Sequence, residues 1–312
     1  MKRRTWARNA AELAAVILFE WIVQCFSLPA ALAGVRKLGS LAFRLSKYRA
    51  RACRQLSEAF PDWPPDRVEA VAGRCFGSLA STLVEALRLP RRRLNPEQLA
   101  EFVEVTLDPE SMRAVRSGQG VLFVTAHLGN WELAPWALNI HGIPIVSVAR
   151  PLENPLLDER ALKIRHRQGQ RVLSKRGALL GISRSLKEGL PVGLVVDQDA
   201  RQEGIFVPFF GKLASTYDSV AAMALRYRCP IVSGYVVRQK RPGTFLAVMD
   251  APIPGDNLPA DPEAAKRELT ARMNLRIESY VRQYPDQWIW HYNRWKTRPP
   301  EESVGAQARP NR

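Results

Sequence analysis

The 312-residue sequence has few of the residues that usually identify a metal site or a disulfide framework. It contains four cysteines and four histidines, and the cysteines form no C-x-x-C pair. This scatter argues against a zinc site and against disulfides, and it favours free thiols in a reducing compartment. The sequence also lacks a Gly- and Ser-rich linker, an internal repeat and the G-x-S-x-G motif of serine hydrolases. A single main domain is the simplest organisation, and a hydrolase is the less favoured enzyme class.

Acidic residues are scarce relative to basic ones. Thirty Asp and Glu face 46 Lys and Arg, which gives a formal net charge of +16. Such a charge attracts anionic lipid headgroups, phosphorylated substrates, acidic carrier proteins or nucleic acid. Because the arginines are dispersed and no nucleic-acid-reading motif is present, we do not expect a nucleic acid partner.

The sequence has no clean membrane-spanning segment either. The stretch 10–35 is apolar, but Glu12 and Glu20 would each cost about 2.5–3.5 kcal/mol at a bilayer centre, and Pro29 interrupts it. It is too long for a signal peptide and has no convincing cleavage site. Basic residues on both sides give no orientation. We therefore expect residues 1–36 to be a retained anchor that lies in or dips into the membrane; a buried helix of the soluble core is the alternative.

The rest of the chain alternates between two patterns. Short apolar runs are typical of strands buried on both faces, and they predict strands at 120–127, 143–150, 171–174, 191–198, 230–237 and 245–249. Apolar residues at spacings of three and four predict helices at 38–90, 130–140, 157–168, 179–188, 219–227 and 262–283. This alternation predicts an α/β fold over residues 37–300, with a central, mainly parallel or mixed sheet flanked by helices and preceded by an N-terminal hydrophobic helix. The tail 301–312 is expected to be disordered.

The segment HLGNWE carries the clearest chemical signal. His127 directly follows an apolar strand, so it lies at the carboxyl end of that strand, where open α/β sheets bind their ligands. Gly129 permits a tight turn, and Asn130 or its neighbour caps a helix whose start Pro135 delays. Glu132 is expected to fold back onto the imidazole, which would make His127 a general base for a hydroxyl group. The alternative is a structural histidine followed by an acid that stabilises the helix start.

Two more charged residues end predicted strands. Asp197 does so in VVDQD and Arg150 in IVSVAR, so both are expected at the same edge of the sheet as His127. Arg150 is a candidate phosphate or oxyanion ligand, because a guanidinium group binds phosphate in a bidentate manner. A structural ion pair for Asp197 and a surface position for Arg150 are the alternatives.

The sequence resembles the lipid A biosynthesis acyltransferases in four blocks that occur in order. These are TAHLGNWE (125–132), ARPLENPLLD with KIRHRQG (149–169), VVDQD with FVPFFGKLAST (195–216), and WIWHYNRWKTRPP (288–300). One departure is ENP where the family has DNP. The resemblance implies transfer of a fatty acyl chain from acyl carrier protein, or from acyl-CoA, to a phosphorylated glycolipid at the cytoplasmic face of the bacterial inner membrane. It implies no metal and no bound cofactor. Another membrane lipid acceptor, such as a phosphatidylinositol mannoside or a lysophospholipid, is the alternative.

The resemblance also implies roles for individual residues. His127 is expected to be the base and Glu132 its partner, with Arg165 and Asp197 at the same site. Asn130 and Arg150 complete the expected substrate-binding set. The donors for a tetrahedral oxyanion are either backbone N–H groups near Gly129 or an arginine.

Two aromatic blocks leave their role open. Phe206, Phe209 and Phe210 either line an acyl groove or pack in the core. The segment WIWHYNRWK (288–296) either forms an aromatic and basic belt at a membrane interface or is part of a buried core.

Overall fold

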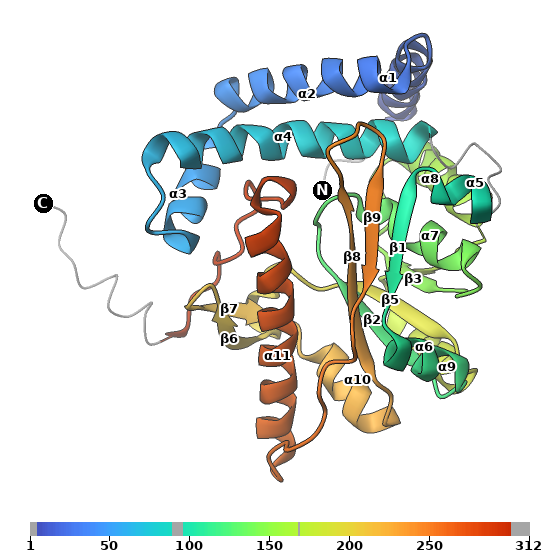
Figure 1. Ribbon diagram of the computed structural model, residues 1–312, viewed down its shortest axis with the longest axis vertical. Coiled ribbons are helices and arrows are strands. Elements are labelled where there is room, and N and C mark those ends of the chain that lie inside the picture. Colours follow the sequence, from blue (N-terminus) through green and yellow to red (C-terminus); the bar gives the residue numbers. More distant parts are fainter. Residues whose placement is uncertain (1–4, 89–95, 168, 301–312) are drawn as a thin grey trace, which may run out of the picture.

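Figure 1 shows the computed structural model of the protein, which describes residues 5–88, 96–167 and 169–300. A seven-stranded sheet with the order β1-β9-β8-β2-β5-β3-β4 forms its centre. Neighbouring strands are parallel except for the antiparallel pair β8 and β9. The α/β fold with a mainly parallel sheet is thus confirmed. The strands of this sheet are β1 (Val103–Leu107), β2 (Val121–Thr125), β3 (Val146–Ala149), β4 (Arg171–Ser174), β5 (Pro191–Val195), β8 (Ile231–Arg238) and β9 (Phe245–Met249).

Helices cover both faces of the sheet, which explains why its central strands are apolar throughout. Helices α9, α10 and α11 contribute to the largest core cluster on one face. Helices α6 and α7 pack on the opposite face, as the arrangement around β8 and β9 shows (Figure 1). The helices after residue 95 are α5 (Pro96–Ala100), α6 (Pro109–Arg116), α7 (Ala134–Ile140), α8 (Pro155–Arg167), α9 (Ala178–Lys187), α10 (Ser219–Tyr227) and α11 (Pro262–Gln283).

The helix after His127 begins later than Asn130. A short 3-10 helix, Trp131–Leu133, comes first, and α7 then starts with Pro135 in its first turn. Proline is tolerated there because the N–H groups of a first helical turn have no partner within the helix. The delayed start expected from Pro135 is therefore confirmed.

A second, two-stranded sheet was not predicted from the sequence. It consists of β6 (Ile205–Phe209) and β7 (Lys212–Thr216). Phe210 and Gly211 join the strands with φ of 51° and 70°, the conformation of a two-residue type I′ turn. Phe209 and Phe210 are buried in the core cluster, so core packing is the correct interpretation for these two residues.

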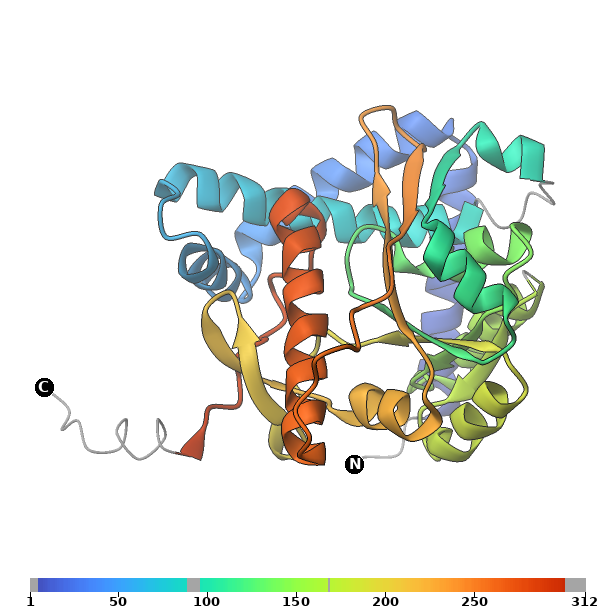
Figure 2. The same ribbon diagram turned by 60° about the horizontal axis from the view of Figure 1, so that its bottom comes forward.

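Four helices lie in the described residues before position 89: α1 (Trp6–Gln24), α2 (Leu28–Leu45), α3 (Arg49–Ala59) and α4 (Pro65–Arg88). Ser27 caps α2, and Pro29 lies in its first turn, so the apolar stretch 10–35 forms two helices. Helix α2 runs alongside α4 (Figure 1 and Figure 2). The two backbones approach closely, because a Cβ at Gly39 would lie 2.7 Å from the carbonyl oxygen of Phe76.

The expected boundary at residue 36 falls inside α2. In the part of the chain that the structure describes, no helix combines the length and the hydrophobicity needed to cross a membrane. The tail 301–312 lies outside the described residues, so its expected disorder stays a prediction.

Helix α1 presents its polar side to the protein and its apolar side outward. Glu20 is buried and forms an ion pair with Arg160 of α8, and the side chain of Asn154 donates to Glu12 at 3.0 Å. The exposed side carries large apolar residues, so the alternative of a buried core helix is wrong for α1. Exposed large apolar residues on α1, on α2 and between them are Trp6, Ile17, Leu18, Trp21, Ile22, Phe26, Leu38, Leu41 and Leu45.

Candidate active site

His127 and Asp197 meet at one edge of the sheet because their strands are neighbours. Strands β2 and β5 are parallel, with Thr125 paired to Val195, and each of the two residues follows its strand by two positions. The backbone N–H of His127 donates to Oδ2 of Asp197 at 2.8 Å, and Nδ1 of the imidazole lies 2.7 Å from Oδ1. The strand-end positions predicted for both residues are confirmed.

This pairing determines the chemistry that the imidazole can perform. Burial is the largest influence on His127 and lowers its pKa, but the charge and hydrogen bond of Asp197, with a further contribution from the charge of Glu132, raise the pKa above its usual value. Asp197 is fully buried, which favours its neutral form, yet its interactions with His127 and Trp288 lower its pKa. A carboxylate on Nδ1 leaves Nε2 for a substrate, which is the arrangement of a general base.

Trp288 completes the surroundings of Asp197. Its indole Nε1 donates to Oδ2 of Asp197 at 2.7 Å, and its backbone forms an antiparallel bridge with Leu128. The indole is 1% exposed, and Trp290 is 0% exposed. The interpretation of this segment as an aromatic belt at a membrane interface is therefore wrong for these residues, which pack in the core. The sequence suggested the alternative of a buried core but not the bond to Asp197.

Glu132 has a different partner from the one expected. It binds the guanidinium of Arg165 in α8, with 3.0 Å from Nη2 to each carboxylate oxygen and 3.3 Å from Nε to Oε2. Asp197 takes the place on the imidazole that we expected for Glu132. Glu132 nevertheless lies close enough to His127 for its negative charge to raise the pKa of the imidazole.

Asn130 does not reach the cavity beside His127. It is 0% exposed, its backbone N–H donates to the carbonyl of Val236 at 2.7 Å, and its side-chain amide donates to Glu85 at 2.9 Å. The backbone and side-chain N–H groups of Asn130 thus hold the turn after His127 to the protein, and the contact of Asn130 with substrate stays a prediction.

The same turn explains the glycine at position 129. Gly129 has a φ of +60°, and a Cβ would lie 2.0 Å from the carbonyl oxygen of Val236, so only glycine fits. Its N–H donates to the carbonyl of Gln287 at 2.9 Å. Because the N–H groups of Gly129 and Asn130 both have partners within the protein, they are not available to an oxyanion. These two N–H groups are therefore excluded as donors, and an arginine stays an expected donor.

An apolar cavity of about 640 Å³ opens beside His127. Binding sites for small ligands commonly have volumes of ~300–1,000 Å³. Arg150, Arg165 and Glu132 line the cavity together with His127, so the structure brings these four predicted residues together. Asp197 lies behind His127. Small side chains leave room under α7, and they include Ala134, Ala137, Gly193, Gly234 and Ala247.

The cavity reaches both faces of the sheet. Phe123 and Val124 both line it although they are consecutive in β2, and the same holds for Gly193 and Leu194 in β5. Successive residues of a strand point to opposite faces. Its other walls come from α7 on one face and from α9 and α10 on the other.

The described residues around the cavity offer no set of side chains that could bind a metal ion. Among the residues that the structure describes, no group of three or more His, Cys, Asp and Glu side chains is arranged to hold a metal ion. The four cysteines are free.

Comparison with known proteins gives a consistent result. A family model described as bacterial lipid A biosynthesis acyltransferase matches residues 1–297. A lipid A biosynthesis lauroyltransferase of Escherichia coli is 29% identical over 84% of this chain and 84% of its own length. A palmitoleoyltransferase of the same organism is 28% identical over 86% and 85%, and an acyltransferase of Haemophilus influenzae is 24% identical over 86% and 82%.

Proposed function

Because the chain belongs to the bacterial lipid A biosynthesis acyltransferase family, we propose that it transfers a fatty acyl chain from an acyl carrier protein thioester, or from acyl-CoA, to a hydroxyl of a lipid A precursor. The observation that carries this proposal is the His127–Asp197 pair beside an apolar cavity. The pair supplies a base, and the cavity supplies space for a hydrocarbon chain.

In the proposed reaction, Nε2 of His127 removes the proton from the acceptor hydroxyl. The resulting alkoxide attacks the thioester carbonyl, forming a C–O bond and a tetrahedral oxyanion. Asp197 stabilises the imidazolium through its contact with Nδ1. When the intermediate collapses, the C–S bond breaks and the thiolate leaves as a thiol with the proton that His127 had taken.

Arg165 is the proposed donor to the oxyanion. It lines the cavity with His127, and Glu132 holds its guanidinium through Nε and Nη2, which leaves Nη1 outside this pair. A donor that is fixed before the reaction stabilises developing charge without reorganisation. Arg150 also lines the cavity and is more exposed, which suits a contact with a phosphate of the acceptor or donor.

We further propose that the exposed apolar side of α1 and α2 lies in the interface of the inner membrane, with the catalytic domain on its cytoplasmic face. Amphipathic helices bind at this depth by burying their apolar side. In α1, the acids that disfavour a membrane crossing face the protein, with Glu20 paired to Arg160. Glu12 and Glu20 therefore do not oppose a membrane contact by residues 1–36. The net charge of +16 adds attraction to anionic lipid.

The test combines one substitution with one lipid analysis. Purified His127→Gln, assayed with acyl carrier protein donor and lipid A precursor, should lose about 10²–10⁴-fold in rate. His141→Gln, at an exposed histidine, is the matched control and should keep its rate. Mass spectrometry of lipids from a deletion strain should show lipid A lacking one acyl chain. Loss of a chain from another lipid alone, or an active His127→Gln, would contradict the proposal.

A further inference from the structure

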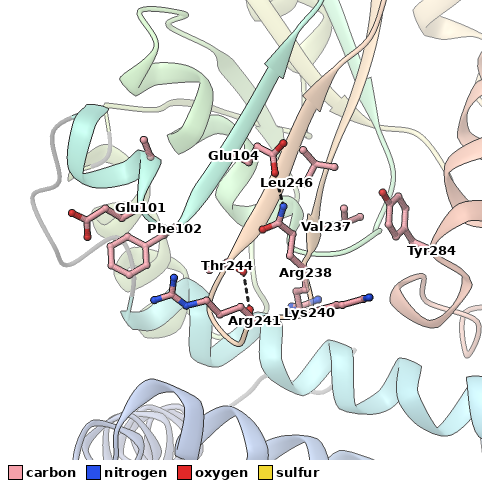
Figure 3. A pocket seen from close by; sticks show the side chains of 12 residues that line it. Glu101, Phe102, Glu104, Val237, Arg238, Lys240, Arg241, Thr244, Leu246 and Tyr284 are labelled. Atoms are coloured by element: carbon pink, nitrogen blue, oxygen red, sulfur yellow. Dashed lines mark hydrogen bonds between the residues drawn. The ribbon is translucent and has the colours of Figure 1, made fainter.

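A buried ion pair lies behind the turn that follows His127. Glu85 of α4 and Arg238 at the end of β8 are joined by contacts of 2.7 Å from Nη2 to Oε2 and 2.9 Å from Nε to Oε1. The Glu85 side chain is 0% exposed and that of Arg238 is 6% exposed. Neither residue lines the cavity beside His127. Arg238 instead borders a separate, open hollow of about 730 Å³ near the β8–β9 hairpin (Figure 3).

A buried ion pair does not by itself indicate a role in stability, because burying the two charges costs desolvation energy. Removing two charges from water costs several kcal/mol per ion, and their attraction often does no more than compensate. Replacing a buried pair with apolar residues is frequently neutral or stabilising. What the pair contacts therefore indicates its role better than its presence does.

The contacts of the pair converge on the turn. Oε2 of Glu85 accepts from the side-chain amide of Asn130 at 2.9 Å. Nη2 of Arg238 donates to Oγ1 of Thr82 at 2.6 Å. The one hydrogen of that hydroxyl is shared between the carbonyl of Gly129 at 3.1 Å and the carbonyl of Ser78 at 3.2 Å. The two residues at the corner of the turn are thus held through three side chains of α4 and β8.

We propose that Glu85 and Arg238 are positioning residues for His127. Asp197 fixes the imidazole and the backbone N–H of His127, while Glu85 and Arg238 fix the turn immediately after it. Both attachments are needed to hold Nε2 at the cavity, and a misplacement of 1 Å in an active site can lower a rate about 10²-fold. The inference rests on the proposed function for its catalytic consequence, but the ordering of the turn can be measured without any activity.

The decisive variant is the double substitution Glu85→Leu with Arg238→Met. Removing both charges together avoids an unpaired buried ion, so we expect the melting temperature to stay near that of the wild type. Amide hydrogen exchange in a peptide covering residues 126–133 should become faster, while exchange in β2 and β5 stays slow. With donor and acceptor supplied, kcat should fall about 10–100-fold, with the KM for the donor within about twofold, because the cavity walls are unchanged. The single variant Glu85→Gln retains Arg238 and keeps an oxygen that can accept from Asn130. Its kcat should therefore lie between that of the double variant and that of the wild type.

A second ion pair gives the matched control. Glu20→Leu with Arg160→Met removes a largely buried pair that joins α1 to α8, and it should alter neither exchange in residues 126–133 nor kcat in detergent solution. Unchanged exchange in the Glu85 and Arg238 double variant would overturn the proposal whatever the activity. Faster exchange with wild-type kcat would overturn the catalytic part. His127→Gln is measured in parallel. If it is active, His127 is not the base, and the ordering of the turn is then judged from hydrogen exchange alone.

Discussion

Trp288 donates its indole hydrogen to Oδ2 of Asp197, 91 residues earlier in the chain, across 2.7 Å. The same carboxylate accepts from the backbone N–H of His127 and contacts its Nδ1. Three donors on one buried carboxylate keep it ionised and leave it little freedom to rotate. The indole is thus part of the arrangement that orients His127, the proposed base, although it lies behind the imidazole.

Trp288→Phe should lower kcat about tenfold and leave the KM for the acyl donor nearly unchanged. The substitution keeps a ring and deletes only the N–H, and a hydrogen bond to a charged group contributes about 1.5–3 kcal/mol. Single-turnover kinetics with acyl carrier protein donor measure the effect. Trp290→Phe is the control, since its indole is equally buried but donates to the carbonyl of Pro285. Equal losses in both variants would mean that only packing is involved.

Asp197→Asn should change the pH dependence as well as the rate. For His127 as the proposed base, the neutral form is the active one, so wild-type kcat/KM should rise with pH through a pKa above 6.5, the ordinary value for histidine. Without the carboxylate charge, burial dominates and lowers the pKa of His127, so the acid limb of the profile should move below pH 6.5. The plateau should fall about 10²–10⁴-fold.

Asp199→Asn controls for the loss of a nearby buried charge. Asp199 lies two positions away and binds the backbone N–H and hydroxyl of Thr297. Its variant should keep the acid limb where the wild type has it. If the acid limb of Asp197→Asn also stays in place, then His127 is not the group that titrates.

Glu132→Gln should lower kcat about 10–100-fold, because Arg165 then loses the carboxylate that fixes its guanidinium near the reacting carbonyl. The control is Glu188→Gln, which breaks an exposed ion pair with Arg171. Its kcat should stay at the wild-type value. Steady-state kinetics at saturating donor measure both variants. A wild-type rate in Glu132→Gln would rule out Arg165 as an oxyanion donor held by this pair.

Leu18→Glu with Trp21→Glu should weaken binding to vesicles that contain phosphatidylglycerol. Both side chains are exposed on α1, and burying one apolar side chain of this size contributes about 1.5–3 kcal/mol, so a fall of at least about tenfold is expected. Vesicle sedimentation measures it. Leu275→Glu on α11, at a leucine that is 67% exposed, should bind as the wild type does. Undiminished binding by the double variant would place the membrane contact elsewhere.

The strand ends of the site could be predicted from the sequence, but the partner of His127 could not. His127 and Asp197 each follow an apolar run, and that pattern alone places them at one edge of a parallel sheet. Which strands are neighbours depends on the strand order, and β2 lies next to β5 only in the folded sheet. Glu132 was expected on the imidazole because it falls in the first turn of the helix predicted after His127 and could fold back onto it, whereas the folded sheet places Asp197 there.

The fold also has parts that local sequence predicts and parts that depend on residues distant in the sequence. Buried strands such as β2 and β5 are readable because both of their faces are covered. The β6–β7 hairpin is difficult to predict because proline is uncommon inside a strand, as at Pro208, and because Phe210 occupies a turn position where φ is positive. Burial of Trp288 and Trp290 was one of two interpretations, because a segment that mixes aromatic and basic residues suits a membrane interface as well as a core.

The position of Trp288 in the chain determines when the candidate site can be completed during synthesis of the protein. Asp197 leaves the ribosome 91 residues before the indole that donates to it, and Gln287, which accepts from the N–H of Gly129, follows equally late. His127 and Asp197 can meet in a nascent chain, but the turn after His127 and the Asp197 carboxylate have all of these partners only after translation has passed Trp288. A product terminated before that residue would keep every strand of the central sheet and still lack the indole that donates to Asp197 in the candidate site.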